Sequence, residues 1–146
     1  MDDHALLAAT IELSRNCPPS DSAFSVGALV VDAAGAVLAD GWSRRDDPHD
    51  HAEEAALATL GDGWRAPPGT TVYSSLEPCS ARASRPRTCT QLILAAGIDR
   101  VVFAWREPSI FVDCEGAELL RAAGVEVLEM AELAAGVRKV NAHLLG

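Results

Sequence analysis

Three residues with metal-binding side chains and one carboxylate stand at spacings that could build a catalytic centre. A single alanine separates His51 from Glu53, Cys79 follows Pro78, and Cys89 comes ten positions after Cys79. One imidazole and two thiolates are a ligand set for zinc, and a catalytic zinc leaves its fourth position for water. We therefore predict a zinc site of His51, Cys79 and Cys89, with Glu53 as the group that moves protons.

These four side chains have the parts needed for hydrolytic deamination of an aminated ring. Zinc lowers the pKa of a bound water to about 7, so a nucleophile is available at neutral pH. A carboxylate beside it can take the proton of that water and pass it towards the leaving amine. The spacing thus favours a zinc-dependent hydrolase that releases ammonia from a heterocyclic base, nucleoside or nucleotide.

Two other interpretations of the same residues remain open. Asp50 and Glu53 have the spacing of a helix capping box, which needs no metal. A non-catalytic partner module could also keep zinc for stability alone, with four protein ligands. His49, Cys17 or Cys114 could supply the fourth. We expect instead that His49 is a solvated loop residue and that the two extra cysteines are idle thiols.

Length and composition restrict the class of protein. The chain has 146 residues, of which 49% are hydrophobic, and this predicts one globular domain over residues 1–146. The net charge of -9 counts against a nucleic-acid-editing enzyme. No apolar run is long enough to span a bilayer, and the N-terminus lacks the basic region of a secretion signal. We therefore expect a cytoplasmic protein with a small-molecule substrate and no membrane partner.

The hydrophobic pattern predicts an α/β fold with a mixed five-stranded sheet and helices on both faces. Strands are predicted at 26–31, 37–42, 71–76, 100–105 and 125–128, and helices at 3–15, 51–60, 89–96, 115–123 and 130–145. The first two strands form an antiparallel hairpin, and the later alternation of strand and helix predicts parallel strands. His51 and Glu53 then lie on the first turn of a helix, while Cys79 follows a strand and Cys89 begins the next helix.

The sequence resembles the cytidine deaminase-like superfamily. The likeness is carried by His51-Ala52-Glu53, by Ser75-Leu76-Glu77-Pro78-Cys79-Ser80 and by a second cysteine, and extends through residues 26–28, 95–101 and 120–127. Within the superfamily, the chain is most similar to the pyrimidine deaminase domain of bacterial riboflavin biosynthesis. The resemblance implies a three-layer α/β/α fold, the zinc site given above and a homo-oligomer, a dimer or tetramer. Bifunctional relatives carry a following reductase domain, which we do not expect here.

The chain departs from that family where the family holds its substrate. Ala23-Phe24 replaces an Asn-Pro pair, Ser43 stands where a histidine is frequent, and nine rather than eight residues separate the two cysteines. A buried amide or imidazole that grips a polar base edge contributes strongly to substrate discrimination. We hypothesise a retained deamination centre with an altered pocket, whose substrate is not the riboflavin precursor. The riboflavin-pathway deaminase itself is the alternative.

Three arginines, Arg82, Arg85 and Arg87, lie between the two cysteines. A guanidinium group offers a bidentate fork to a phosphate or carboxylate, so these residues could clamp the substrate. The alternative, which we favour slightly, is a solvated surface loop. Arg44 and Arg45 could join such a clamp or could be exposed.

Aromatic side chains near the predicted site have two possible roles. Phe24 and Trp42 could stack on a substrate ring, or they could be ordinary core at strand ends, and Trp105 is in the same position. With Ser43 and the three loop arginines, Phe24 and Trp42 complete the set of candidate substrate-binding residues.

Overall fold

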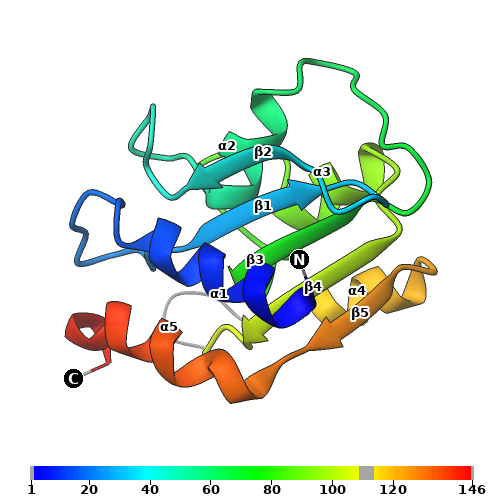
Figure 1. Cartoon of the computed structure of the whole chain (residues 1–146). Coiled ribbons are helices and arrows are strands. Elements are labelled where there is room, and N and C mark those ends of the chain that lie inside the picture. Colours follow the sequence, from blue (N-terminus) through cyan, green and yellow to red (C-terminus); the bar gives the residue numbers. More distant parts are fainter. Residues whose placement is uncertain (1, 109–113, 146) are drawn as a thin grey trace.

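The computed structural model describes residues 2–108 and 114–145, and these form three layers around one sheet (Figure 1). The strand order is β2-β1-β3-β4-β5. The strands are β1 (Gly27–Val31), β2 (Val37–Trp42), β3 (Thr71–Leu76), β4 (Arg100–Trp105) and β5 (Glu126–Glu129). β1 is antiparallel to β2 and β3, whereas β3, β4 and β5 are parallel. The predicted mixed five-stranded sheet is confirmed.

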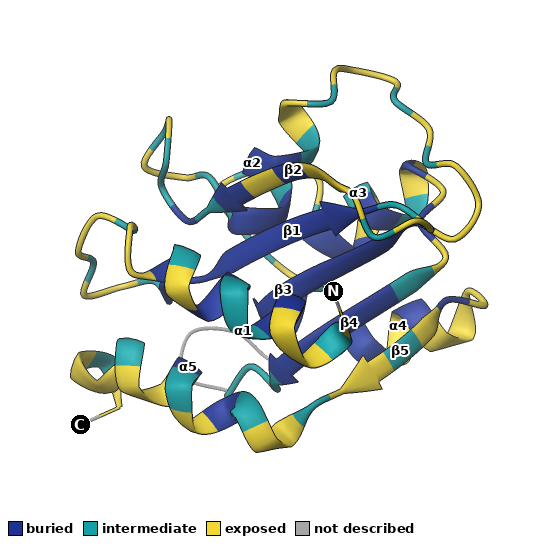
Figure 2. Cartoon of the chain, viewed as in Figure 1, coloured by how far each residue is buried: buried dark blue, intermediate teal, exposed yellow. Residues whose placement is uncertain are grey.

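Helices cover both faces of this sheet (Figure 1). α1 (Asp3–Ser14) and α5 (Ala134–Val140) lie on one face, while α2 (Ala52–Ala58), α3 (Cys89–Ala95) and α4 (Gly116–Ala122) lie on the other. Figure 2 shows that β1, β3 and β4 are buried and that the edge strands β2 and β5 carry exposed residues. Burial on both faces explains why the central strands are continuous apolar runs rather than alternating ones.

The C-terminal segment differs from the prediction of one helix over 130–145. It consists of a 3-10 turn (Ala131–Leu133), α5 and a second 3-10 turn (Ala142–Leu144). The side-chain amide of Asn141 donates to the carbonyls of Val137 and Ser25, so it competes with the regular helical hydrogen bonds. No helix within residues 2–108 and 114–145 has the length and hydropathy needed to cross a membrane.

Two glycines allow close packing of helices next to the predicted metal ligands. A Cβ atom at Gly41 in β2 would lie 2.4 Å from the carbonyl oxygen of Ala52, at the start of α2. A Cβ atom at Gly116, at the start of α4, would lie 1.9 Å from the carbonyl oxygen of Pro78. Because any side chain would clash at both positions, glycine is required for this close packing.

Candidate active site

The predicted metal ligands come together. Nδ1 of His51 lies 3.4 Å from Sγ of Cys79 and 3.4 Å from Sγ of Cys89. Zinc bonds of about 2.0–2.1 Å to nitrogen and about 2.3 Å to sulfur around a tetrahedral ion place the two ligand atoms about 3.6 Å apart. The donor set therefore fits one zinc ion.

Within the described parts of the chain, no fourth histidine, cysteine or carboxylate joins this group. Sγ of Cys17 instead donates to the carbonyl of Val26, and Sγ of Cys114 donates to that of Pro78. His49 is exposed in the loop before α2. Three ligands with an open fourth position are typical of catalytic rather than structural zinc.

The two cysteine ligands are positioned by the end of a strand and the start of a helix. Cys79 lies just beyond β3, and Cys89 is the first residue of α3, which Thr88 caps. The amide of Cys89 donates to Sγ of Cys79 over 3.2 Å, and such amide donors favour a thiolate. The thiol of Cys89 also donates to Cys79, which lowers the pKa of Cys79 and raises the pKa of Cys89.

Glu53 is buried beside these ligands, with 4% of its surface exposed. Burial, reinforced by the charge of Cys79, raises the pKa of the Glu53 carboxyl. The hydroxyl oxygen of Ser74 lies 3.1 Å from Oε1 of Glu53 and 2.7 Å from the carbonyl oxygen of Leu76. A carboxyl group with a raised pKa in a dry site is suited to holding and releasing a proton.

The alternative of a capping box between Asp50 and Glu53 is wrong. The N-cap of α2 is His51, and its backbone N–H donates to Oε1 of Glu54 over 3.2 Å. Glu54 therefore caps the helix, because it occupies the third helical position after the N-cap. Glu53 is left facing the metal ligands.

A cavity of about 590 Å³ opens onto His51, Glu53 and Cys79. Its volume lies within the range of small-molecule sites. We call these three residues the metal side. The rest of the cavity is closed largely by an outer wall of loop residues from 19–24, 43–50 and 81–84.

Long-range hydrogen bonds hold the first loop of the outer wall. The guanidinium of Arg44, a residue with φ of 61°, donates to the carbonyls of Pro18 and Phe24. From the C-terminal segment, Oδ1 of Asn141 accepts the backbone N–H of Ser25 over 2.7 Å. Asn141 also donates to the Ser25 carbonyl and has no exposed surface. The loop is thus fixed from two sides.

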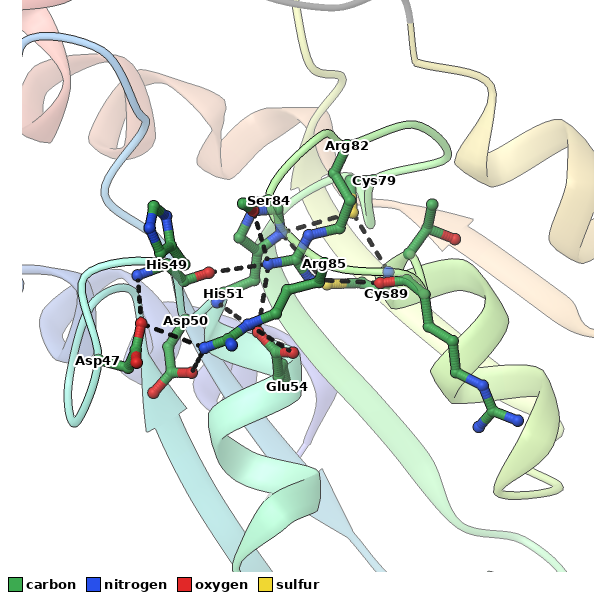
Figure 3. A network of polar contacts seen from close by, with 12 residues as sticks. Asp47, His49, Asp50, His51, Glu54, Cys79, Arg82, Ser84, Arg85 and Cys89 are labelled. Carbon is green, nitrogen blue, oxygen red and sulfur yellow. Dashed lines mark hydrogen bonds and ion pairs between the residues drawn. The ribbon is translucent and has the colours of Figure 1, made fainter.

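The metal loop, residues 80–88, is fixed to the start of α2 by Arg82 (Figure 3). Its guanidinium donates to the carbonyl of His49 over 2.8 Å and to Oε1 of Glu54 over 3.3 Å. Only 3% of the Arg82 side chain is exposed. Glu54 therefore joins this loop to the residue that carries the imidazole ligand.

Arg85 extends the same network to two further carboxylates. Its Nη2 lies 3.1 Å from Asp47 and 3.3 Å from Asp50, and in Figure 3 its guanidinium points towards both. Arg87 is exposed and is not among the residues that line the cavity. Of the three loop arginines, the structure therefore brings only Arg82 to the cavity.

The remaining candidates divide between cavity and surface. Phe24 lines the cavity and packs edge-on against Trp105, with ring centroids 6.0 Å apart. Ser43 also lines it, and its hydroxyl accepts the backbone N–H of Val26, which directly precedes β1. Trp42 does not line it and lies under the guanidinium of Arg45, 5.2 Å from the ring centre. Of these three predicted substrate contacts, two line the cavity and Trp42 does not.

Glu107 is a cavity residue that the sequence analysis missed. It follows the carboxyl end of β4, and its backbone N–H donates to Glu77. Oε2 of Glu107 is buried and has no hydrogen-bond partner among the described residues. Burial raises the pKa of this carboxyl to about 7. Its place just after a parallel strand could have identified it, because open α/β sheets bind their ligands at the carboxyl ends of such strands.

The fold and the site together define a class. An α/β/α protein with a three-ligand His/Cys/Cys zinc site and a buried non-ligand glutamate has the arrangement of the zinc deaminases. Residues 1–105 match the family model described as "Cytidine and deoxycytidylate deaminase zinc-binding region", and the chain belongs to this family.

Relatives within this family confirm the resemblance to riboflavin-pathway deaminases. The diaminohydroxyphosphoribosylamino-pyrimidine deaminase of Schizosaccharomyces pombe is 42% identical over 118 residues, which cover 80% of this chain and 29% of that protein. The RibD protein of Escherichia coli is 36% identical over 104 residues, which cover 70% of this chain and 26% of RibD. The chain thus spans less than a third of these curated relatives.

A solved structure agrees with these sequence matches. The diaminohydroxyphosphoribosylaminopyrimidine deaminase/5-amino-6-(5-phosphoribosylamino)uracil reductase of Thermotoga maritima is 31% identical and superposes with a TM-score of 0.73. The match covers 93% of this chain and 38% of that one. The predicted three-layer fold is therefore shared with a deaminase of known structure.

Proposed function

We propose that this protein is a zinc-dependent hydrolase that releases ammonia from an aminated pyrimidine or a related heterocycle. One observation carries the proposal: the imidazole of His51 and two thiols converge beside the buried carboxyl of Glu53, at the floor of a cavity. This arrangement can activate water and transfer its proton within one enclosed site. Membership of a zinc-binding deaminase family supports the same reaction.

The chain supplies the groups that the reaction needs. His51, Cys79 and Cys89 would hold zinc, which supplies a Lewis acid that activates water when bound. Glu53 would pass one proton of this water to the ring nitrogen and would then carry the remaining hydroxyl proton to the amine, which leaves as ammonia as the carbonyl forms. Ser74 lies beside Oε1 of Glu53 and restricts the orientation of the carboxyl group. The outer wall would enclose the ring and keep bulk water away from it.

We further propose that the pocket differs from that of the riboflavin-pathway relatives. The described residues that line the cavity include no asparagine or glutamine. The hydroxyl of Ser43, which stands where those relatives frequently have histidine, is already bonded to the backbone of Val26. Discrimination between heterocycles depends on such polar side chains, so we propose a substrate other than the riboflavin precursor.

The experiment is a screen for ammonia release by the zinc-loaded protein. Cytosine, guanine, adenine, their nucleosides and nucleotides, and the diaminopyrimidine nucleotide of the riboflavin pathway form the panel. Glu53→Ala should keep zinc and release no ammonia from any of them. High turnover of the riboflavin precursor would refute the altered pocket while confirming a deaminase. No turnover of any compound by zinc-loaded protein would contradict the proposed reaction.

We also propose a cytoplasmic homo-oligomer that acts as one domain over residues 1–146 and does not bind nucleic acid. All four cysteines are free thiols, which supports a reducing compartment. A single sheet joins all the described strands, which supports one domain. The net charge of -9 argues against nucleic acid. Sedimentation of the purified protein tests the oligomer, and a gel shift with single-stranded RNA or DNA tests nucleic-acid binding.

A further inference from the structure

Glu107 is a half-buried residue of the cavity to which the proposed reaction assigns no role. It lies two positions beyond β4 and lines the cavity. Its Oε2 atom is buried and has no hydrogen-bond partner in the described part of the chain. A buried oxygen without a partner is costly, because it has lost its water and gained nothing in exchange. In a ligand cavity, such an atom identifies a group that the ligand can satisfy.

The sheet places Glu107 next to the metal side. β3 and β4 are parallel neighbours, and Leu76 pairs with Trp105 at their carboxyl ends. The chain reaches Cys79 three residues after Leu76, and it reaches Glu107 two residues after Trp105. Burial is the main cause of the raised pKa of Glu107, and the nearby charges of Cys79 and Glu53 add to it. Glu107 is therefore close to the place where the ring of a substrate would react.

The backbone of Glu107 is fixed by a second buried carboxyl group. Its N–H donates to Oε1 of Glu77 over 3.2 Å, and Oε2 of Glu77 accepts the N–H of Ala117 over 2.9 Å. Burial raises the pKa of Glu107, and the thiol of Cys114 beside it partly offsets this effect. The position of Glu107 is thus set before a ligand binds, and such preorganisation favours selective binding.

Glu107 differs from the other polar side chains around the cavity. Among the described residues that line it, only Glu107 and Arg82 have a buried side-chain nitrogen or oxygen without a partner. Nε of Arg82 is a donor and belongs to the outer wall, so it cannot accept a hydrogen bond from a ligand. The carboxyl of Glu53, on the metal side, is already bonded to the hydroxyl of Ser74. Glu107 is therefore the acceptor available to an N–H group of a bound ring.

A carboxyl oxygen can accept a hydrogen bond whether the group is ionised or neutral. We propose that Glu107 is a specificity residue that accepts a hydrogen bond from a second N–H group of the substrate, on the same six-membered ring as the amine that leaves. This N–H is a ring N–H or a second amino group. Cytidine and adenosine lack it and should be poor ligands, because they would leave Glu107 unpaired. The inference rests on the proposed deaminase function and narrows its substrate class.

Binding to zinc-loaded Glu53→Ala protein, which should not turn over its ligands, tests the inference. Guanine, 2,6-diaminopurine, isocytosine and 2,4-diaminopyrimidine carry two N–H groups on the six-membered ring. Adenine, 2-aminopurine, 2-aminopyrimidine and 4-aminopyrimidine carry only the amine. Titration calorimetry should show a two-donor probe that binds at least about tenfold tighter than the one-donor probes of its series. Equal binding within both series, or no binding of any two-donor probe, would overturn the inference.

Substitution of Glu107 in the same Glu53→Ala background shows whether this residue sets the preference. Glu107→Leu removes both oxygens, so the preference should fall below about threefold through weaker binding of the two-donor probes alone. Glu107→Gln keeps one acceptor oxygen and should retain part of the preference. Glu118→Gln is the matched control, because Glu118 pairs with Arg106 outside the cavity, and it should keep the full preference. Equal weakening of all probes in Glu107→Leu would indicate a structural role and overturn the inference.

Ammonia release by zinc-loaded protein that keeps Glu53 separates this inference from the proposed function. Turnover of one-donor probes as efficient as that of two-donor probes would keep the deaminase and reject the role of Glu107. Selective binding of two-donor probes without ammonia release from any probe would keep the role of Glu107 and reject the deaminase.

Discussion

The metal side and the outer wall of the cavity are built in different ways. The metal side comes from the ends of α2 and β3, and its side chains pack against buried neighbours. The outer wall comes from loops that are held by contacts across the chain, such as the pair of Asn141 and Ser25, 116 positions apart. The two sides are thus held by different kinds of contact. We therefore expect changes in the outer wall to alter substrate binding more than metal binding.

The largest effect should follow removal of a metal ligand. Cys89→Ala deletes one of three ligands, so zinc affinity should fall by more than roughly a hundredfold and ammonia release should be lost. The protein should also unfold at a lower denaturant concentration, because metal binding contributes to folding. Zinc content after dialysis and a urea titration measure both effects. Cys17→Ala, which removes a thiol outside the site, should keep its zinc.

Removing the proton carrier should reduce the rate and leave the metal in place. Glu53→Gln keeps the shape of the side chain but cannot take up a proton, so kcat should fall by about 10²–10⁴-fold. Steady-state ammonia release and zinc content are the measurements. A variant with near wild-type kcat would show that another group of the cavity, such as Glu107, moves the proton.

A change behind the outer wall should affect binding more than chemistry. Asn141→Ala leaves the N–H and carbonyl of Ser25 without their partner, which should lower the free energy of unfolding by about 1–3 kcal/mol. The loop over 19–24 should then be less well fixed, so KM should rise more than kcat falls. Zinc content should be unchanged. If zinc content and kcat fell together, the outer wall and the metal side would not be independent.

The smallest effect is expected far from both sides. Asp3 accepts two hydrogen bonds from Arg100 and one from Tyr73, and these contacts, led by Arg100, lower the pKa of Asp3 to about 2. A lowered pKa stabilises the fold above the usual value of 3.8, and this contribution is lost as pH falls towards 2. At pH 7, Asp3→Asn should therefore cost about 1 kcal/mol after solvent screening.

Urea titrations of the Asp3→Asn variant and the wild type check this dependence. The difference between the two proteins should shrink as the pH is lowered from 7 to 3, while kcat and KM stay at wild-type values. A difference that is constant with pH would mean that the charge of Asp3 does not stabilise the protein.

The metal side could be predicted from the sequence because its information is local. His51 and Glu53 are two positions apart at a helix start, and the strand before Cys79 was predicted with its observed bounds. The parallel pairing of β3, β4 and β5 followed from the alternation of strand and helix. Short connections restrict such folds to a few arrangements.

The outer wall could not be predicted because its contacts join residues that are distant in sequence. Nothing local indicates that Asn141 holds Ser25. The pairing of Arg82 with Glu54 likewise depends on how the metal loop folds over the helix. The candidate substrate contacts were chosen by residue type alone. They therefore included some residues that line the cavity and others that lie on the surface.

The most direct test of the central claim is the coordination of zinc in the purified protein. X-ray absorption at the zinc edge, with metal analysis of the same sample, reports the number and type of ligands. We predict one zinc per chain, bound by one imidazole, two sulfurs and one oxygen from solvent. Protein that takes up no zinc, or zinc with a fourth side chain in place of solvent, would contradict the account.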